Sequence, residues 1–261
     1  MSDHGKPPAS SFALGAAPAA PAGAATEAGQ RAELAAAYRL IAREGWDDLI
    51  YSHVTASVPG EPGHFLINPF GLRFAEVTPQ SLVKIDLAGR RVGPDDGTLV
   101  NRSGFALHAA VHRARPDAVC VLHLHETSAI AVSTHPRGLL PLSQHALRFH
   151  GCLALHPYEG VALEPAEAQR LLASLGDRPA ALLRNHGSLV LGRTVAEAYT
   201  LTATLIKACR IQIAALAGNP APVLPAPEVI ERAARQLFDN GALEGVLEWP
   251  ALLRSLDPDP D

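Results

Sequence analysis

Cysteine is scarce in this sequence. The chain has three cysteines in 261 residues, Cys120, Cys152 and Cys209, and they stand in apolar surroundings without the close spacing of a metal-binding motif. An odd number of cysteines argues against the disulfide framework of a small secreted protein. We therefore expect a protein of the reducing cytoplasm.

The sequence also lacks an excess of basic residues. Lysine and arginine together number 22 against 26 aspartates and glutamates, for a formal net charge of -4. A chain with this balance has no overall attraction for nucleic acid or for an anionic membrane. No window approaches about 18 uninterrupted apolar residues, so the sequence predicts no transmembrane helix. We expect neither nucleic acid nor a membrane as a partner.

The first residues are poor in large apolar side chains. Residues 1–26 are rich in alanine, proline, glycine and serine, and such a segment cannot bury enough apolar surface to offset the entropy of ordering. Pro18 and Pro21 also interrupt the apolar run that a signal peptide would need. We expect a disordered tail over 1–26, one domain over 27–219, and a Pro-rich linker with a C-terminal helical segment over 220–261.

Helical and extended patterns alternate along the predicted domain. Short turns join several extended runs, which favours antiparallel pairing, and no Gly-rich phosphate loop opens a helix. The sequence thus predicts an α/β domain that is not a Rossmann sheet. Helical spacing covers 27–44, 103–115, 127–133, 165–175, 194–217 and 228–240, and extended runs cover 49–58, 64–68, 83–87, 118–125, 180–183 and 189–191.

The most informative stretch is 118–125, an extended run that ends in two histidines. Because side chains alternate along a strand, Val121, His123 and His125 point to one face. The two imidazoles start about 6 to 7 Å apart along the backbone, and converging side chains can close that separation onto one ion. His186, between two further apolar runs, is the candidate third ligand. Three neutral imidazoles leave an open coordination position, which is typical of catalytic zinc sites.

A second pair, His108 and His112, lies one helical turn apart. This spacing also suits a metal, although a solvent-facing or core-packing role is more frequent. Metal-bound imidazoles usually need a partner for the other ring nitrogen, and His108 is a candidate for that role.

Three stretches taken together resemble the class II aldolase/adducin family in order and spacing: 103–112, 114–125 and 185–187. The resemblance covers roughly 32–217. It implies a three-layer α/β/α domain around a mostly antiparallel central sheet. It also implies a homotetramer.

By this resemblance, His123, His125 and His186 correspond to the three zinc-binding histidines of the family. Zinc is therefore the expected metal. Three imidazoles also accept Mn²⁺, Co²⁺, Ni²⁺ or Fe²⁺, so the sequence leaves the identity of the ion open.

The chain departs from the aldolases of this family at their catalytic acid. Those enzymes carry a glutamate where this chain has Gly104, so the resemblance places it in an adducin-like subgroup without that acid. The phosphate-binding positions of the aldolases correspond to Ser52-His53, Phe70-Gly71 and Arg102-Ser103, which do not carry over. A phosphorylated sugar is therefore not the expected substrate. A glutamate introduced at Gly104 is expected to point at the open metal position.

The missing acid bears on the reaction. Aldol cleavage, epimerisation and dehydration need a positioned proton carrier, whereas decarboxylation mainly needs an electron sink. We expect a metal-dependent lyase-like enzyme, of decarboxylase or aldolase type, that acts on a small oxo- or hydroxy-acid through a metal-stabilised enolate. The alternatives are a non-catalytic adducin-like binding module and a sugar-phosphate aldolase, epimerase or dehydratase with a relocated acid.

Other polar residues are candidates for proton transfer and for substrate binding. Imidazole, phenol and carboxyl groups can carry protons, and guanidinium groups such as that of Arg184 can bind a substrate carboxylate. The expected catalytic residues are His145, Tyr158 and Glu126. The expected substrate-binding residues are Arg102, Ser103, Gln144, Arg148, Asn68 and Gly71.

Overall fold

The computed structural model describes residues 25–94, 96–160, 165–218, 221–238 and 244–256. Almost all of the predicted tail lies outside these ranges. At the end of that tail, the Thr26 side chain accepts a hydrogen bond from Gly29 N and caps the first helix. Among the described helices, none is both long and apolar enough to cross a lipid bilayer.

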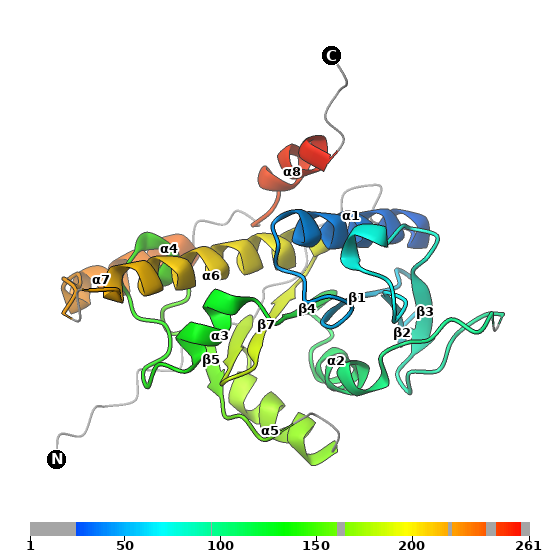
Figure 1. The fold of residues 1–261 in the computed structure, drawn as a ribbon, viewed down its shortest axis with the longest axis horizontal. Coiled ribbons are helices and arrows are strands. Elements are labelled where there is room, and N and C mark those ends of the chain that lie inside the picture. The colour runs from blue at the N-terminus through cyan, green and yellow to red at the C-terminus, as the bar shows by residue number, and fades with distance from the viewer. Residues whose placement is uncertain (1–24, 95, 161–164, 219–220, 239–243, 257–261) are drawn as a thin grey trace.

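A seven-stranded sheet forms the middle layer of the molecule (Figure 1). Its order is β3-β2-β1-β4-β7-β6-β5, and neighbours pair antiparallel except β5 and β6, which are parallel. The prediction of a mostly antiparallel sheet is confirmed. The strands are β1 His53–Ser57, β2 His64–Ile67, β3 Val83–Asp86, β4 Cys120–Leu124, β5 Leu153–His156, β6 Ala180–Leu183 and β7 Gly187–Gly192.

Helices cover both faces of the sheet, which confirms the α/β fold (Figure 1). Helices α1, α6 and α8 lie on one side, and α2 and α5 lie on the other. Asn101 starts α2, because its side chain accepts a hydrogen bond from Gly104 N. The helices are α1 Glu27–Arg43, α2 Arg102–Ala114, α3 Thr127–Ser133, α4 Gln144–Leu147, α5 Pro165–Leu175, α6 Val195–Leu216, α7 Pro227–Phe238 and α8 Glu248–Leu256, with a 3-10 turn η1 Phe74–Glu76.

Strand β4 is the central strand of the sheet, with β1 on one side and β7 on the other. All five of its residues are buried, as its continuous apolar run predicts. Cys120 and Leu122 pack into the core beneath α1 and α6, whereas Val121 packs into the core of α2 and α5. By alternation, His123 shares the face of Val121 and points toward α2 and α5.

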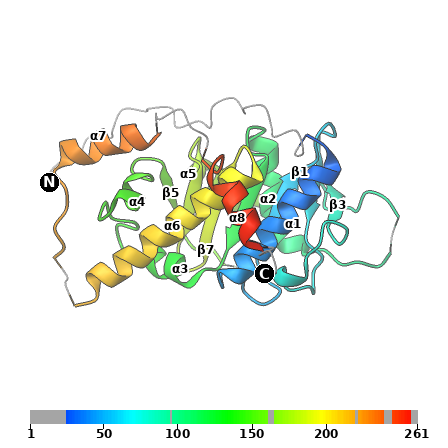
Figure 2. The same cartoon turned by 90° about the horizontal axis from the view of Figure 1, so that it is seen from above.

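The C-terminal helix α8 packs onto the domain core. It lies against both α1 and α6 (Figure 2). Trp249 in this helix is 5% exposed, and its ring lies 5.7 Å from the ring of Tyr199 in α6. The end of the predicted C-terminal segment therefore contributes a large aromatic side chain to the main core.

We predict that Trp249→Ala lowers the free energy of unfolding by about 3 to 5 kcal/mol, because it leaves a cavity between α8 and α6. The matched control is Leu247→Ala, two residues away, where the side chain is 84% exposed. That control is expected to stay within about 0.5 kcal/mol of the parent chain. Urea unfolding measures both. Equal stabilities for the two variants would show that α8 does not support the core.

Candidate metal centre

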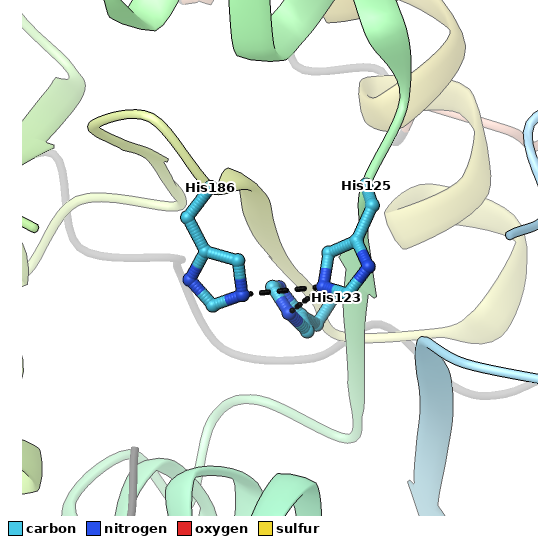
Figure 3. Close-up of side chains that lie close together, drawn as sticks. All are labelled: His123, His125 and His186. Carbon is cyan, nitrogen blue, oxygen red and sulfur yellow. Dashed lines mark hydrogen bonds between the residues drawn. The ribbon is translucent and has the colours of Figure 1, made fainter. Parts of the chain in front are cut away.

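The three predicted ligands lie together at one end of β4 (Figure 3). His123 stands near the end of the strand, His125 directly follows it, and His186 comes from the turn between β6 and β7. Nε2 of His125 is 3.1 Å from Nε2 of His123 and 3.2 Å from Nε2 of His186. Two adjacent strands and one tight turn thus bring three imidazole nitrogens to one point.

The backbone of the turn explains why asparagine precedes His186 and glycine follows it. Asn185 adopts a left-handed backbone with φ of 57°, a conformation that asparagine tolerates better than most residues. A Cβ on Gly187 would lie 2.3 Å from the backbone oxygen of Leu124, so a larger residue there would collide with β4. Gly187 therefore allows β7 to approach β4. The left-handed backbone of Asn185 turns the chain so that His186 lies next to His125.

Hydrogen bonds fix the tautomers of His123 and His125. Nδ1 of His123 lies 3.0 Å from the carbonyl oxygen of Ser188, and Nδ1 of His125 lies 2.9 Å from Oδ2 of Asp48. A carbonyl or carboxylate oxygen only accepts, so each Nδ1 carries the proton and donates it. In the neutral rings, each Nε2 therefore carries a bare lone pair. Two such lone pairs face one another at 3.1 Å.

This donor set fits a zinc-type ion. In a tetrahedral site with metal–nitrogen bonds of about 2.0–2.1 Å, ligand nitrogens lie about 3.3–3.4 Å apart, close to the separations observed. Burial, with a further contribution from the neighbouring histidines, lowers the pKa of His123 well below its usual range and lowers that of His186 to about 4. Because the rings of His123 and His186 resist protonation, a metal cation is a fitting partner for the converging lone pairs.

A strained loop between α1 and β1 supports His125. Leu49 and Ser52 both have positive φ, 52° and 66°, which is unfavourable for residues with a side chain. In this conformation Ser52 Oγ accepts a hydrogen bond from His125 N at 3.3 Å, and Asp48 reaches Nδ1 of the same residue. The sequence alone does not reveal the supporting roles of Asp48 and Ser52. A carboxylate behind a metal-bound imidazole is common, but nothing in the sequence marks which acid, 77 residues away, takes that place.

His108 and His112 are buried rather than solvent-facing, and neither supports the three ligands through a hydrogen bond. Nδ1 of His112 donates to the carbonyl oxygen of Ala118 at 3.1 Å, so its Nε2 accepts the hydroxyl proton of Thr55 at 2.8 Å. Thr55 Oγ1 then accepts from Nδ1 of His108 at 2.7 Å. Our expectation that His108 orients a metal ligand is wrong in this geometry, because Ser188 and Asp48 do so.

Tyr158 is the expected proton carrier that the structure brings to the histidines. Its ring centroid lies 6.3 Å from that of His186, and its side chain is 54% exposed. Both residues line a cavity of about 20 Å³, together with His156. That is about the room one water molecule needs. Tyr158 therefore stands at the boundary between solvent and the three histidines.

Two other expected catalytic residues lie elsewhere. The Glu126 carboxylate caps α3 by accepting from Ser128 and Ala129, and it also pairs with Arg210. His145 lines a groove along α6, on the face of the sheet opposite His123. Within one chain, neither side chain is available to a ligand at the three histidines.

Several expected substrate-binding residues have structural partners instead. Arg148 pairs with Glu244, and Arg184 donates to the backbone oxygens of 133, 135 and 136. Asn68 is buried and accepts from the Tyr38 hydroxyl at 2.9 Å. Gln144 is exposed on α4, and Gly71 lies in an exposed turn with φ of 108°. Arg102 and Ser103 begin α2, and their side chains lie outside the part of the chain that the structure describes.

The expectation for a glutamate at Gly104 needs correction. A Cβ added to Gly104 would lie 2.0 Å from Cε1 of His53, inside any normal contact distance. The imidazole of His53 fills the space into which a side chain at 104 would extend. A glutamate there would collide with His53 before its carboxylate reached the metal centre.

We predict that His123→Ala, His125→Ala and His186→Ala each abolish tight metal retention, because two imidazoles do not hold a zinc-type ion tightly. Asp48→Asn is expected to weaken metal affinity by about 10- to 100-fold, because it removes the charge that orients His125. His150→Ala is the matched control, since that imidazole pairs with Glu231 away from the site. Elemental analysis after dialysis gives the metal content. Full occupancy in His186→Ala would remove it from the ligand set.

We predict that the free energy of unfolding decreases as the pH falls, and that protonation of His112 accounts for part of this decrease. Burial lowers its pKa to about 4 in the folded chain, against about 6.5 when unfolded. Its contribution is complete above about pH 6.5 and is lost as the pH falls toward 4, with a slope of at most about 1.4 kcal/mol per pH unit. Urea unfolding between these limits, with a chelator present, is expected to show a shallower slope for His112→Gln. Parallel slopes would contradict the assignment.

Comparison with known proteins agrees with this architecture. The model of the family "Class II Aldolase and Adducin N-terminal domain" matches residues 32–213. The crystal structure of an aldolase II superfamily protein from Pseudomonas syringae is 45% identical and superposes with a TM-score of 0.85, covering 89% of this chain and 93% of its own. An L-fuculose 1-phosphate aldolase from Glaciozyma antarctica PI12 is 29% identical with a TM-score of 0.78, covering 88% and 89%.

The adducins match a smaller share of their own length. Alpha-adducin from Mus musculus is 45% identical over 194 residues, which is 74% of this chain but 26% of the adducin. The match to the family model covers more than half of the chain, and it includes all three histidines of the candidate metal centre. The chain belongs to the class II aldolase and adducin family.

Proposed function

We propose that this chain is a metal-dependent lyase-like enzyme, of decarboxylase or aldolase type, that acts on a small oxo- or hydroxy-acid. The observation that carries the proposal is the convergence of three imidazole nitrogens on a single point, with hydrogen bonds at Nδ1 of His123 and His125 that leave bare lone pairs on two of them. When bound there, a divalent ion, in the first place zinc, would polarise a substrate carbonyl and stabilise negative charge beside the bond that breaks.

The residues around this point would hold and orient the reacting groups. Ser188 and Asp48 keep His123 and His125 in one tautomer, so no reorganisation is needed when an ion or a substrate arrives. Tyr158 is the proposed proton carrier, because its hydroxyl-bearing ring lies beside His186 and is open to solvent. Solvent exposure lets the phenol exchange its proton with water between turnovers.

The surroundings of Gly104 support an acid as the proposed substrate. No carboxyl group stands at this position, and His53 closes the space that one would need. A reaction in which CO₂ leaves needs less proton transfer near the metal than aldol cleavage does. An acid is therefore favoured over a sugar phosphate, and Tyr158 supplies the later protonation.

Two other functions remain as alternatives, each favoured by one comparison. Similarity to the adducins favours a binding module without catalysis. Similarity to an L-fuculose 1-phosphate aldolase favours a sugar-phosphate aldolase, which would need a relocated acid. Retention of all three histidines supports metal chemistry over a binding module, because a binding module has no need of converging lone pairs. Assembly as a homotetramer, as the resemblance implies, and a cytoplasmic location stay predictions.

The test is turnover by the zinc-loaded protein on a panel of oxo-acids, hydroxy-aromatic acids and sugar phosphates, including L-fuculose 1-phosphate. We expect CO₂ release from an acid. Tyr158→Phe is expected to lower that rate by about 10²- to 10⁴-fold while metal content stays unchanged. His150→Phe serves as the matched aromatic control, with the parent rate.

Three outcomes would contradict the proposal. Cleavage of the sugar phosphate alone would assign the aldolase alternative. A metal-replete protein inert toward the whole panel would favour the binding module. An unchanged rate in Tyr158→Phe would remove Tyr158 from the reaction.

A further inference from the structure

The three histidines of the candidate metal centre differ in how their second ring nitrogen is held. His123 and His125 each donate the Nδ1 proton to a protein oxygen, of Ser188 and of Asp48. In the part of the chain that the structure describes, the imidazole of His186 has a hydrogen-bond partner only at Nε2, which lies 3.2 Å from Nε2 of His125. Its Nδ1 points away from the other two rings (Figure 3). A metal-bound imidazole almost always donates from this second nitrogen, so Nδ1 of His186 calls for an acceptor.

A fourth histidine, His156, stands beside this ligand. It is the last residue of β5, and it pairs in register with Leu183 at the end of β6, three residues before His186. Both imidazoles line the cavity of about 20 Å³ that Tyr158 borders. His156 is not among the side chains whose ligand atoms lie within 4.8 Å of one another. The register of β5 with β6 therefore brings a further imidazole to His186 without adding it to the ligand set.

The hydrogen bonds of His156 fix its tautomer. Its Nδ1 lies 3.0 Å from Oγ of Ser174, and that hydroxyl donates to the carbonyl oxygen of Arg170 at 3.0 Å. A hydroxyl has one proton, so Oγ of Ser174 accepts the proton of Nδ1, and Nε2 of His156 carries a bare lone pair. Burial lowers the pKa of His156, which keeps the ring neutral at physiological pH.

This lone pair is buried and has no protein partner. His156 is 5% exposed, and its Nε2 forms no hydrogen bond with any described residue. Buried polar groups in native proteins are almost always paired, because an unpaired group loses its interaction with water and gains nothing in return. Nε2 of His156 therefore calls for a donor, whereas Nδ1 of His186 calls for an acceptor. The two requirements are complementary.

One water molecule can meet both requirements, since it accepts and donates at the same time. The shared cavity has about the volume that one water needs, and a buried water needs at least two polar partners. A bridging water of this kind is nearly as favourable as a direct hydrogen bond. The cavity, the bare acceptor and the third ligand together describe a built position for it.

We propose that His156 is a positioning residue for His186, acting through a single buried water that accepts the Nδ1 proton of His186 and donates to Nε2 of His156. Ser174 fixes the tautomer of His156, and the water then fixes that of His186. Nε2 of His186 is thereby kept bare for a metal ion, as Ser188 and Asp48 keep the other two rings. This assignment rests on the metal centre of the proposed function but not on the reaction.

The test separates the acceptor at Nε2 from the volume of the side chain. His156→Leu removes the acceptor, whereas His156→Gln places an amide oxygen near the position of Nε2. Leu175→Ala is the matched control for lost packing, because Leu175 is 0% exposed in the core beneath α5 and does not line the cavity. Competition with a chromophoric chelator gives the zinc affinity of each protein. The thermal midpoint is measured on the metal-free proteins.

We expect His156→Leu to bind zinc about 10- to 100-fold more weakly than the parent, which is the usual effect of removing a residue that supports a metal ligand. His156→Gln is expected to regain most of the affinity. Leu175→Ala is expected to bind zinc as the parent does, although its thermal midpoint falls. Ser174→Ala frees the tautomer of His156 and is expected to have an affinity between those of the parent and His156→Leu.

A spectroscopic measurement reports on the bridge itself. In ¹H–¹⁵N spectra of the zinc-loaded protein, the Nδ1 proton of His186 is identified by its loss in His186→Ala. We expect this proton to be visible in the parent and in His156→Gln. It is expected to disappear by exchange with solvent in His156→Leu, because nothing then holds the water in place.

Equal zinc affinity in the parent and His156→Leu would overturn the assignment. So would an equal loss in His156→Leu and His156→Gln, because packing rather than the acceptor would then be responsible. If His156→Leu does not fold, a parent-like affinity in Ser174→Ala would overturn it instead. A parent protein that binds zinc but is inert toward the acids would overturn the proposed reaction alone, whereas one that takes up no zinc would overturn both.

Discussion

Two imidazole lone pairs that face one another across 3.1 Å are the constraint on which the candidate metal centre depends. Ser188 and Asp48 impose this arrangement, because each accepts the Nδ1 proton of one ring and leaves its Nε2 bare. Lone pairs so placed repel unless a cation lies between them. Burial disfavours a proton on His123 and on His186, because it lowers the pKa of both rings. A divalent metal is the cation that we propose for this point.

The fold is arranged so that this constraint is stable. Strand β4 is the central strand of the sheet, and apolar side chains bury both of its faces up to His123. Pairing of β7 with β4 continues to Ser188, whose carbonyl holds His123, and Gly187 permits that close approach. The loop between α1 and β1, which supports His125, carries local strain, because Leu49 and Ser52 both have positive φ. The stability of the sheet keeps Ser188 beside His123 and keeps the strained loop with Asp48 beside His125.

Much of this could be predicted from the sequence, and the remainder has a physical reason. Alternation along 118–125 predicts which face His123 occupies, and the apolar run predicts a strand buried on both sides; the structure agrees with both. His186 is a candidate from its place between two apolar runs, and the order and spacing shared with a family support that choice. The supporting roles of Asp48 and Ser188 could not be predicted, because they arise from contacts between segments distant in sequence. Residues such as His145 and Arg148 have suitable chemistry, but they pack on the other face or pair with a distant acid.

The tautomers of His123 and His125 show most directly whether the two rings present bare Nε2 lone pairs to a metal ion. Long-range ¹H–¹⁵N correlation spectra of the metal-free protein, assigned with His123→Gln and His125→Gln, report which nitrogen of each ring carries the proton. We predict protonated Nδ1 and bare Nε2 in both rings, with the Nε2 resonances shifting when Zn²⁺ is added and the Nδ1 protons retained. Protonated Nε2 in either ring, or spectra that do not respond to Zn²⁺, would contradict this prediction.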